Sequence, residues 1–147
     1  MEINRYAPLI ARKKIFIHAP LETVWSIQTH INAWREWQPD ISRSNLDGGL
    51  EVGSIFQWRS GGFSVTSTIQ IIESLHCIGW TGMAFGSRAR HLWTFQQQQD
   101  GTEVTTEESM EGWLISMLKY LRPHFLEMSL DVWLKSLKAK AESQVTQ

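Results

Sequence analysis

The chain has 147 residues, enough to bury a hydrophobic core and few enough to expect a single domain over residues 1–147. The chain contains 42% apolar and 20% charged residues, which is ordinary for a soluble globular protein. Its 14 basic and 15 acidic residues give a net charge of -1, so its charge gives no reason to expect nucleic acid as a partner. The single cysteine, Cys77, excludes an intrachain disulfide and fits a cytoplasmic location, and the absence of a run of about 18 apolar residues excludes a membrane-spanning helix.

Three short elements are expected before residue 40. The β-prone run Lys13–His18 predicts the first strand. A helix over Pro20–Thr29 follows, because proline is favoured in the first turn of a helix. A second short helix over Ile31–Trp37 brings two of the eight tryptophans, Trp34 and Trp37, onto one side. The sequence therefore opens with a strand and two short helices.

Between residues 41 and 110 apolar and polar residues alternate, which is the spacing of half-buried β-strands. Turn signals interrupt this pattern at intervals of about 10 to 15 residues. They are Asp47–Gly49, Gly61-Gly62, Glu73-Ser74, Gly82–Gly86 and Asp100-Gly101. These connections divide the region into about six strands, joined in sequence as an antiparallel meander.

The C-terminal part, from about Leu114 to Ala141, has helical spacing. Pro123 predicts a break, with one long helix after it. Two adjacent apolar stripes run along this part, formed by Leu121, Phe125, Met128 and Val132 and by Leu126, Leu130, Trp133, Leu134 and Leu137. Because such a broad apolar face must be covered, the predicted fold class is α+β: a curved antiparallel meander wrapped around the long C-terminal helix, with a space left between them.

The hairpin turns predict which strand residues face inward, since a two-residue turn determines the register. Taken as such turns, Asp100-Gly101, Gly61-Gly62 and Glu73-Ser74 predict that His91 lies opposite Met110, Trp93 opposite Glu108, Trp58 opposite Val65, and Ile69 opposite Ile78. All three turns assign one inward face, which holds Phe56, Trp58, Val65, Ser67, Ile69, Ile78, Trp80, Ala89, His91, Trp93, Phe95, Thr106, Glu108 and Met110.

Four stretches of the chain resemble the polyketide cyclase/dehydrase branch of the START-like (SRPBCC) superfamily. They are IFIHAPLETVWSIQTHINAWREWQPDI, LEVGSIFQWRSGGFSVTSTIQIIES, GWTGMAFGSRARHLWTF and GTEVTTEESMEGWL, and the likeness runs from about Lys14 to Ala141. The resemblance implies a helix-grip fold with a deep, mostly apolar cavity between sheet and helix. Relatives include aromatic polyketide cyclases, lipid carriers and hormone-binding proteins, without a catalytic motif common to all. The resemblance therefore implies a cavity and assigns no catalytic residue.

Two polar residues, His91 and Glu108, interrupt the apolar inner face. The predicted register makes them diagonal neighbours across a strand pair, about 7–8 Å apart at the backbone. A carboxyl group in apolar surroundings has a raised pKa, and an imidazole beside it can be held in one tautomer. Three interpretations stay open: the two side chains satisfy each other and stabilise the cavity wall, they anchor a ligand, or they serve as general acid and base in a cyclisation or dehydration.

Contacts to a ligand are expected from the inner face, the C-terminal helix and one loop. The entrance is expected between the loop Gly82–Gly86 and the short helices near Trp34 and Trp37. The loop has a glycine at each end, and Met83 and Phe85 between them either cap the core or form a mobile lid. The predicted ligand-binding residues are Phe56, Trp58, Ser67, Ile69, Ile78, Trp80, Phe85, His91, Trp93, Thr106, Glu108, Met110, Phe125 and Met128.

The function predicted first is binding of a hydrophobic or aromatic small molecule in an internal cavity, for storage, transport or sensing. An enzyme of cyclase or dehydratase type that uses His91 and Glu108 is the alternative, and a protein-interaction module is a third hypothesis. No set of His, Cys, Asp and Glu has metal-ligand spacing, and no glycine-rich phosphate loop occurs, so neither a metal nor a cofactor is expected. The sequence leaves the oligomeric state open.

Overall fold

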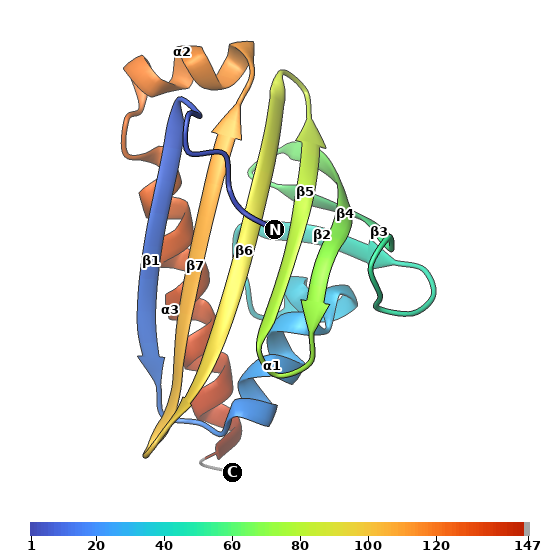
Figure 1. The fold of residues 1–147 in the computed structure, drawn as a ribbon, viewed down its shortest axis with the longest axis vertical. Helices are drawn as coiled ribbons and strands as arrows, with labels where there is room; N and C mark the ends of the chain where they lie inside the picture. The colour runs from blue at the N-terminus through green and yellow to red at the C-terminus, as the bar shows by residue number, and fades with distance from the viewer. Residues whose placement is uncertain (146–147) are drawn as a thin grey trace.

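A computed structural model describes residues 1–145, in which a seven-stranded antiparallel sheet is combined with short helices and one long C-terminal helix (Figure 1). The elements are β1 (Leu9–Ile17), α1 (Leu21–Thr29), the 3-10 helix η1 (Ile31–Glu36), β2 (Ile41–Leu46), β3 (Ile55–Ser60), β4 (Phe63–Glu73), β5 (Cys77–Ala84), β6 (Ser87–Gln98), β7 (Gly101–Glu111), α2 (Trp113–Leu121) and α3 (Phe125–Val145). The spatial order β1-β7-β6-β5-β4-β3-β2 leaves β2 to β7 as a continuous meander. The predicted α+β helix-grip fold is confirmed.

The break predicted at Pro123 is also confirmed, since the proline lies between the end of α2 and the start of α3. The first strand begins earlier than the predicted Lys13. Leu9 and Ala11 are buried at its start and Ile17 at its end, all at odd positions. This alternation extends the strand because the same face of β1 continues to contact the core.

The β3–β4 hairpin has the predicted register. Gly61 and Gly62 both have positive φ, at 55° and 88°, which is the conformation that two-residue hairpin turns favour. Trp58 lies opposite Val65 and Phe56 opposite Ser67. The turn chemistry alone was therefore sufficient to place these side chains.

The predicted β6–β7 register is wrong by two residues. The turn is formed by Gln99 and Asp100, and Gly101 is already the first residue of β7. A Cβ atom at position 101 would lie 2.2 Å from the carbonyl oxygen of Ile17, so the strand start needs glycine for close approach to β1. His91 consequently lies directly opposite Glu108. A shift of two residues changes partners but keeps both faces.

The predicted β4–β5 register is wrong as well. Glu73 pairs with Cys77, and Leu75 in the intervening turn has a φ of 64°. The pairing then shifts between Ile69 and Ile71, so that Ile69 lies opposite Trp80. Such a bulge inserts one residue on one strand. The turn has one residue more than predicted, and the bulge compensates for it, so Ile69 still lies on the buried face. The predicted inward face of β4 is therefore preserved.

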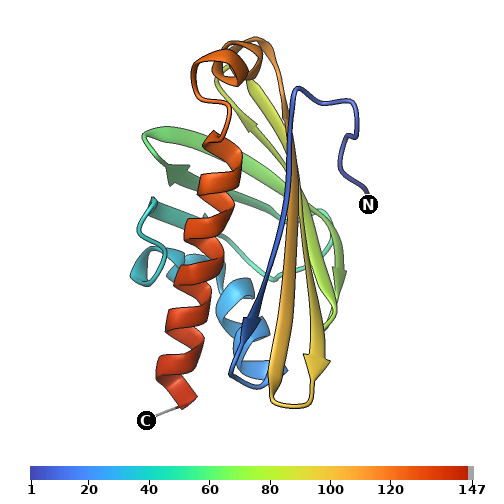
Figure 2. The same ribbon diagram turned by 90° about the vertical axis from the view of Figure 1, so that its left-hand side faces the viewer.

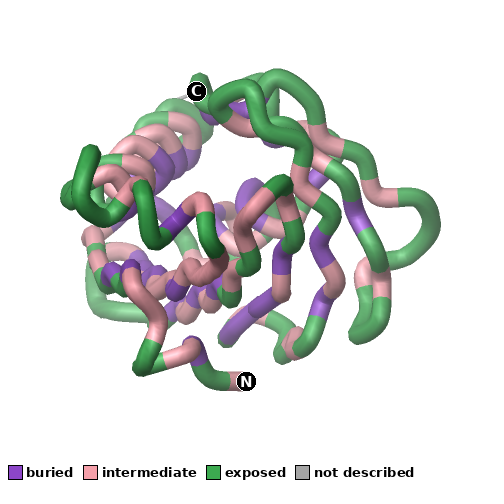
Figure 3. The backbone as a smooth tube through the Cα atoms, turned by 90° about the horizontal axis from the view of Figure 1, so that it is seen from above, coloured by how far each residue is buried: buried purple, intermediate pink, exposed green. Residues whose placement is uncertain are grey.

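The helix α3 lies along one side of the sheet, as Figure 2 shows, and packs against β1. Its buried residues are Leu126, Leu130, Trp133, Leu134, Leu137 and Ala141. Met128, which the sequence analysis predicted to contact a ligand, is 59% exposed and lies off the buried side of the helix. Each residue turns an α-helix by about 100°, which directs Met128 to the side opposite Leu126 and Leu130. Figure 3 shows the buried stretches along the strands and one side of this helix.

A cluster of tryptophan rings fills the centre between sheet and helices. Trp34 from η1 is fully buried, and its ring centroid lies between 5.2 and 5.7 Å from those of Phe56, Trp58, Trp80 and Trp133. Trp93 is also fully buried. Much of the aromatic inner face is therefore packed core.

The N-terminal segment lies against the opposite, outer face of the sheet. The Asn4 backbone N–H donates to Ser109 Oγ at 2.9 Å, and the Arg90 guanidinium donates to the Glu2 carbonyl oxygen at 3.3 Å. Ile3 is buried in this contact region. Cys77 is a free thiol and is buried. Part of the polar outer face is thus covered by the chain itself.

Candidate functional pocket

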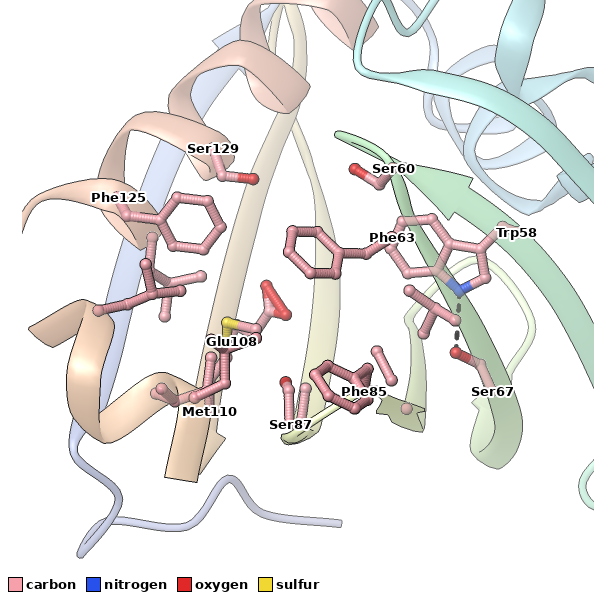
Figure 4. A pocket seen from close by; sticks show the side chains of 18 of the residues that line it. Trp58, Ser60, Phe63, Ser67, Phe85, Ser87, Glu108, Met110, Phe125 and Ser129 are labelled. Carbon is pink, nitrogen blue, oxygen red and sulfur yellow. Dashed lines mark hydrogen bonds between the residues drawn. The ribbon is translucent and has the colours of Figure 1, made fainter. Parts of the chain in front are cut away.

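A pocket of about 110 Å³ lies where the β3–β4 and β5–β6 hairpins approach α2 and the start of α3 (Figure 4). Phe63 and Phe85 on these hairpins are 45% and 72% exposed, so the pocket opens to solvent between them. Its wall is mostly apolar. An engineered cavity of about 150 Å³ is known to hold benzene. The enclosed part of this pocket therefore suits a single ring, and the remainder of a larger molecule would lie in the mouth.

The predicted ligand-binding residues divide into those that line the pocket and those that do not. Lining residues are Trp58, Ser67, Trp80, Phe85, Glu108, Met110 and Phe125. Phe56, Ile69, Ile78, His91, Trp93 and Thr106 are buried but lie outside the lining, and Met128 is exposed. The division follows from the tryptophan cluster, which occupies the middle of the inner face, whereas the hairpin end is open.

The predicted entrance is wrong in part. Ala84 pairs with Ser87, so Phe85 and Gly86 alone form the β5–β6 turn, and Gly82 belongs to β5. A lid with two glycine hinges is therefore not built into this loop. The short helices α1 and η1 lie at the other end of the sheet, as Figure 1 shows, and Trp34 is fully buried. The pocket opens beside α2 instead.

Sequence reasoning missed the contribution of α2, which lines the pocket with Leu114, Ile115 and Leu118. The position of this helix depends on Gly112, whose φ of 118° turns the chain after β7. A Cβ atom on Gly112 would lie 2.4 Å from the carbonyl oxygen of Gly86. In the sequence, the glycine directly after the last strand could have indicated that the chain turns there and places the next helix across the end of the sheet.

Glu108 stands between the pocket and His91. Figure 4 shows its carboxyl group pointing toward the space between Phe63 and Phe125. Behind it, His91 Nδ1 lies 3.5 Å from Glu108 Oε1, and His91 Nε2 lies 2.7 Å from Thr106 Oγ1. The imidazole is only 2% exposed. A molecule in the pocket would thus contact the carboxyl group and not the ring.

Burial makes both members of this pair uncharged near neutral pH. It raises the pKa of Glu108 to about 8 and lowers the pKa of His91 to about 3, because the apolar surroundings penalise each charged form. A protonated carboxyl group can donate a hydrogen bond to a ligand carbonyl oxygen or to His91 Nδ1. Chemically, the site offers one transferable proton inside an apolar wall.

Within residues 1–145, no group of three or more His, Cys, Asp and Glu side chains could hold a metal ion. None of the helices in this range combines the length and the apolar character needed to cross a bilayer.

Comparison with solved structures shows the same fold in proteins of low sequence identity. A hypothetical protein from Helicobacter pylori has a TM-score of 0.84 at 16% identity, over 93% of this chain and 90% of that one. The Zhui aromatase/cyclase from a Streptomyces species has a TM-score of 0.81 at 11% identity, over 93% and 95%. A START superfamily protein from Mycobacterium smegmatis has a TM-score of 0.75 at 15% identity, over 92% and 98%.

A comparison with curated proteins found no match. The family described as polyketide cyclase / dehydrase and lipid transport matches residues 9–142. This range runs from the first residue of β1 into the last turns of α3 and includes every residue of the pocket. The chain therefore belongs to the polyketide cyclase / dehydrase and lipid transport family.

Proposed function

We propose that the protein binds a hydrophobic or aromatic small molecule in the pocket beside α2, for storage, transport or sensing. The supporting observation is an apolar recess, open to solvent, that contains one carboxyl group. Burying apolar ligand surface supplies affinity at roughly 25 cal/mol per Å² before the costs of association. Glu108 supplies a polar contact that orients the ligand.

Filling the pocket tests this proposal. Ala89 on β6 lines the pocket, so Ala89→Phe places a ring where the ligand would lie. We expect wild-type protein to bind naphthalene in isothermal titration calorimetry and Ala89→Phe to bind it at least about tenfold more weakly, a loss of about 1.4 kcal/mol. Extraction and native mass spectrometry of freshly purified protein should show an apolar ligand in the wild type and less of it in the variant.

The matched control is Ala139→Phe, the same change at an exposed position of α3. It should bind naphthalene as the wild type does. Equal affinities of the wild type and both variants would show that the pocket is not the binding site.

A second candidate is an enzyme of cyclase or dehydratase type, favoured by the carboxyl group of Glu108 in the pocket with His91 behind it. In a dehydration, Glu108 would donate a proton to the departing hydroxyl group as the C–O bond breaks and water leaves. The resulting carboxylate would take up the proton that the adjacent carbon loses as the C=C bond forms, with His91 positioning the carboxyl group. Glu108→Gln should then reduce turnover of a polyketide-like substrate by about 10²–10⁴-fold while ligand binding persists. Unchanged turnover in this variant would remove Glu108 from the mechanism.

A further inference from the structure

The pocket contains one ionisable side chain and no cation. Its polar side chains are four serines, the indoles of Trp58, Trp80 and Trp133, and Glu108. Two of the indoles are already hydrogen-bonded, since Trp58 Nε1 donates to Ser67 Oγ at 3.0 Å and Trp133 Nε1 donates to Gln28 Oε1 at 3.1 Å. A ligand that carries a charge into this space would find no side chain of opposite sign except an ionised Glu108.

The basic residues of the strands that form the wall face the other way. Arg59 is exposed, and its guanidinium donates a hydrogen bond to Ser64 Oγ. Arg88 Nη2 lies 3.8 Å from Glu111 Oε2. Arg90 is exposed and bonds to the backbone of the N-terminal segment. Because side chains of a strand alternate between its faces, all three arginines are held away from the pocket.

The groups that face Glu108 leave it without a cationic partner. On β6 it faces His91, whose pKa is lowered by burial and which is uncharged at neutral pH. On β1, Lys13 belongs to the inner side of the sheet, but its Nζ lies 3.8 Å from Asp131 of α3. Neither β5 nor α2 contributes a charged side chain to the lining. Burial alone therefore decides the state of this carboxyl group, and its pKa is raised.

We infer that the pocket selects ligands with a neutral hydrogen-bonding group, such as a ketone or a phenol, and rejects ligands that end in a carboxylate, such as aromatic acids and fatty acids. This inference rests on the proposed ligand-binding function and specifies its substrate class. A ketone oxygen accepts a hydrogen bond from the protonated carboxyl group, and a phenol can donate or accept one. A carboxylate would be buried without a cation, next to a carboxyl group that cannot offset its charge.

The expected size of the discrimination follows from the alternative open to an acid, which is to bind in its protonated form. At pH 7 the solution lies about 3 pH units above the pKa of a carboxylic acid, which is near 4.3, so only a small fraction of the acid is in its neutral form. Each unit lowers this fraction, and with it the apparent affinity, about tenfold. An acid should therefore bind at least about 100-fold more weakly than the matched ketone.

Three naphthalene probes of similar size test this selection: 2-acetylnaphthalene, 2-naphthol and 2-naphthoic acid, titrated calorimetrically at pH 7. The ketone and the naphthol should bind, and the naphthoate should bind at least about 100-fold more weakly. Naphthoate binding as tight as that of the ketone would overturn the inference while leaving the proposed binding function intact. Failure of all three probes, together with failure of naphthalene, would contradict both.

Binding measured at a series of pH values distinguishes a hydrogen bond from protonated Glu108 to the ligand from an apolar wall that disfavours every charged ligand. Affinity of the wild type for 2-acetylnaphthalene should fall above about pH 8, where the carboxyl group loses its proton. Glu108→Gln keeps an N–H donor at every pH and should remove the fall. Glu107→Gln, on the neighbouring residue that faces the other side of β7, should retain it. An affinity of the wild type that is constant from pH 6 to 9 would overturn the assignment of Glu108 as the selecting group.

Discussion

Glu108 and His91 influence stability in opposite directions as the pH changes. Between about pH 4.5 and 8, folded Glu108 keeps a proton that the unfolded chain releases, so stability falls as the pH rises. Between about pH 3 and 6.5, unfolded His91 takes up a proton that the folded protein does not bind, so stability rises with pH. The two slopes cancel where the ranges overlap, and only the decline due to Glu108 remains above about pH 6.5.

We therefore predict that the free energy of unfolding is highest between about pH 4.5 and 6.5 and falls by more than about 1.4 kcal/mol, the equivalent of one pKa unit, between pH 6.5 and 8.5. Urea unfolding at a series of pH values measures it. Glu108→Gln should largely abolish the decline, whereas Glu107→Gln should leave it unchanged. A decline of equal size in Glu108→Gln would show that another group causes it.

At the scale of elements, α2 and the β5–β6 turn form the rim of the pocket. Phe85 and Trp113 pack edge to face there, with ring centroids 5.3 Å apart and both side chains more than half exposed. The close approach of Gly86 and Gly112 holds the two elements together. Rings exposed at a pocket mouth can retard the exit of a ligand while adding little to the core.

Phe85→Ala is predicted to raise the ligand dissociation rate by on the order of tenfold, equivalent to a lost contact of about 1.4 kcal/mol. The free energy of unfolding should change by less than about 1 kcal/mol, because the side chain is 72% exposed. Stopped-flow tryptophan fluorescence with a bound ketone probe measures the rate. Met83→Ala serves as control, because Met83 is 63% exposed and does not line the pocket. An unchanged dissociation rate would place the exit path elsewhere.

For the whole molecule, the tryptophan cluster joins elements that are distant in the chain. Trp34 connects η1 with β3, β5 and α3 through ring contacts, and its Nε1 donates to the Gln28 carbonyl oxygen at 2.9 Å. Gln28 in turn accepts from Trp133 Nε1 at 3.1 Å. The short helices are thereby attached to both the sheet and the long helix.

Trp34→Ala should destabilise the protein by about 3–5 kcal/mol, since it leaves a large cavity among rings that cannot close over it. Trp113→Ala removes the same side chain from a half-exposed position and should cost less than about 1 kcal/mol. Chemical denaturation of the two variants provides the comparison. Similar losses in both would mean that the cluster can repack around the missing ring.

The sequence alone determined the order of the elements, the break at Pro123 and the inward face of the sheet. These features depend on local signals. Alternation with a period of two assigns each strand residue to a face, and Gly61-Gly62 adopts its turn without help from distant residues. The same alternation explains why the faces survived two errors in register, since a shift of two or a compensating bulge returns each side chain to its side.

Only the tertiary structure decided where the pocket lies and which groups meet in it. The position of Gly101 depends on its contact with Ile17, 84 residues away in the chain, and this contact sets His91 directly opposite Glu108. The tryptophans from η1, the sheet and α3 fill the centre because their rings meet only when all three elements are assembled. Packing of this kind depends on the shapes of side chains from distant segments, which periodicity along one segment does not contain.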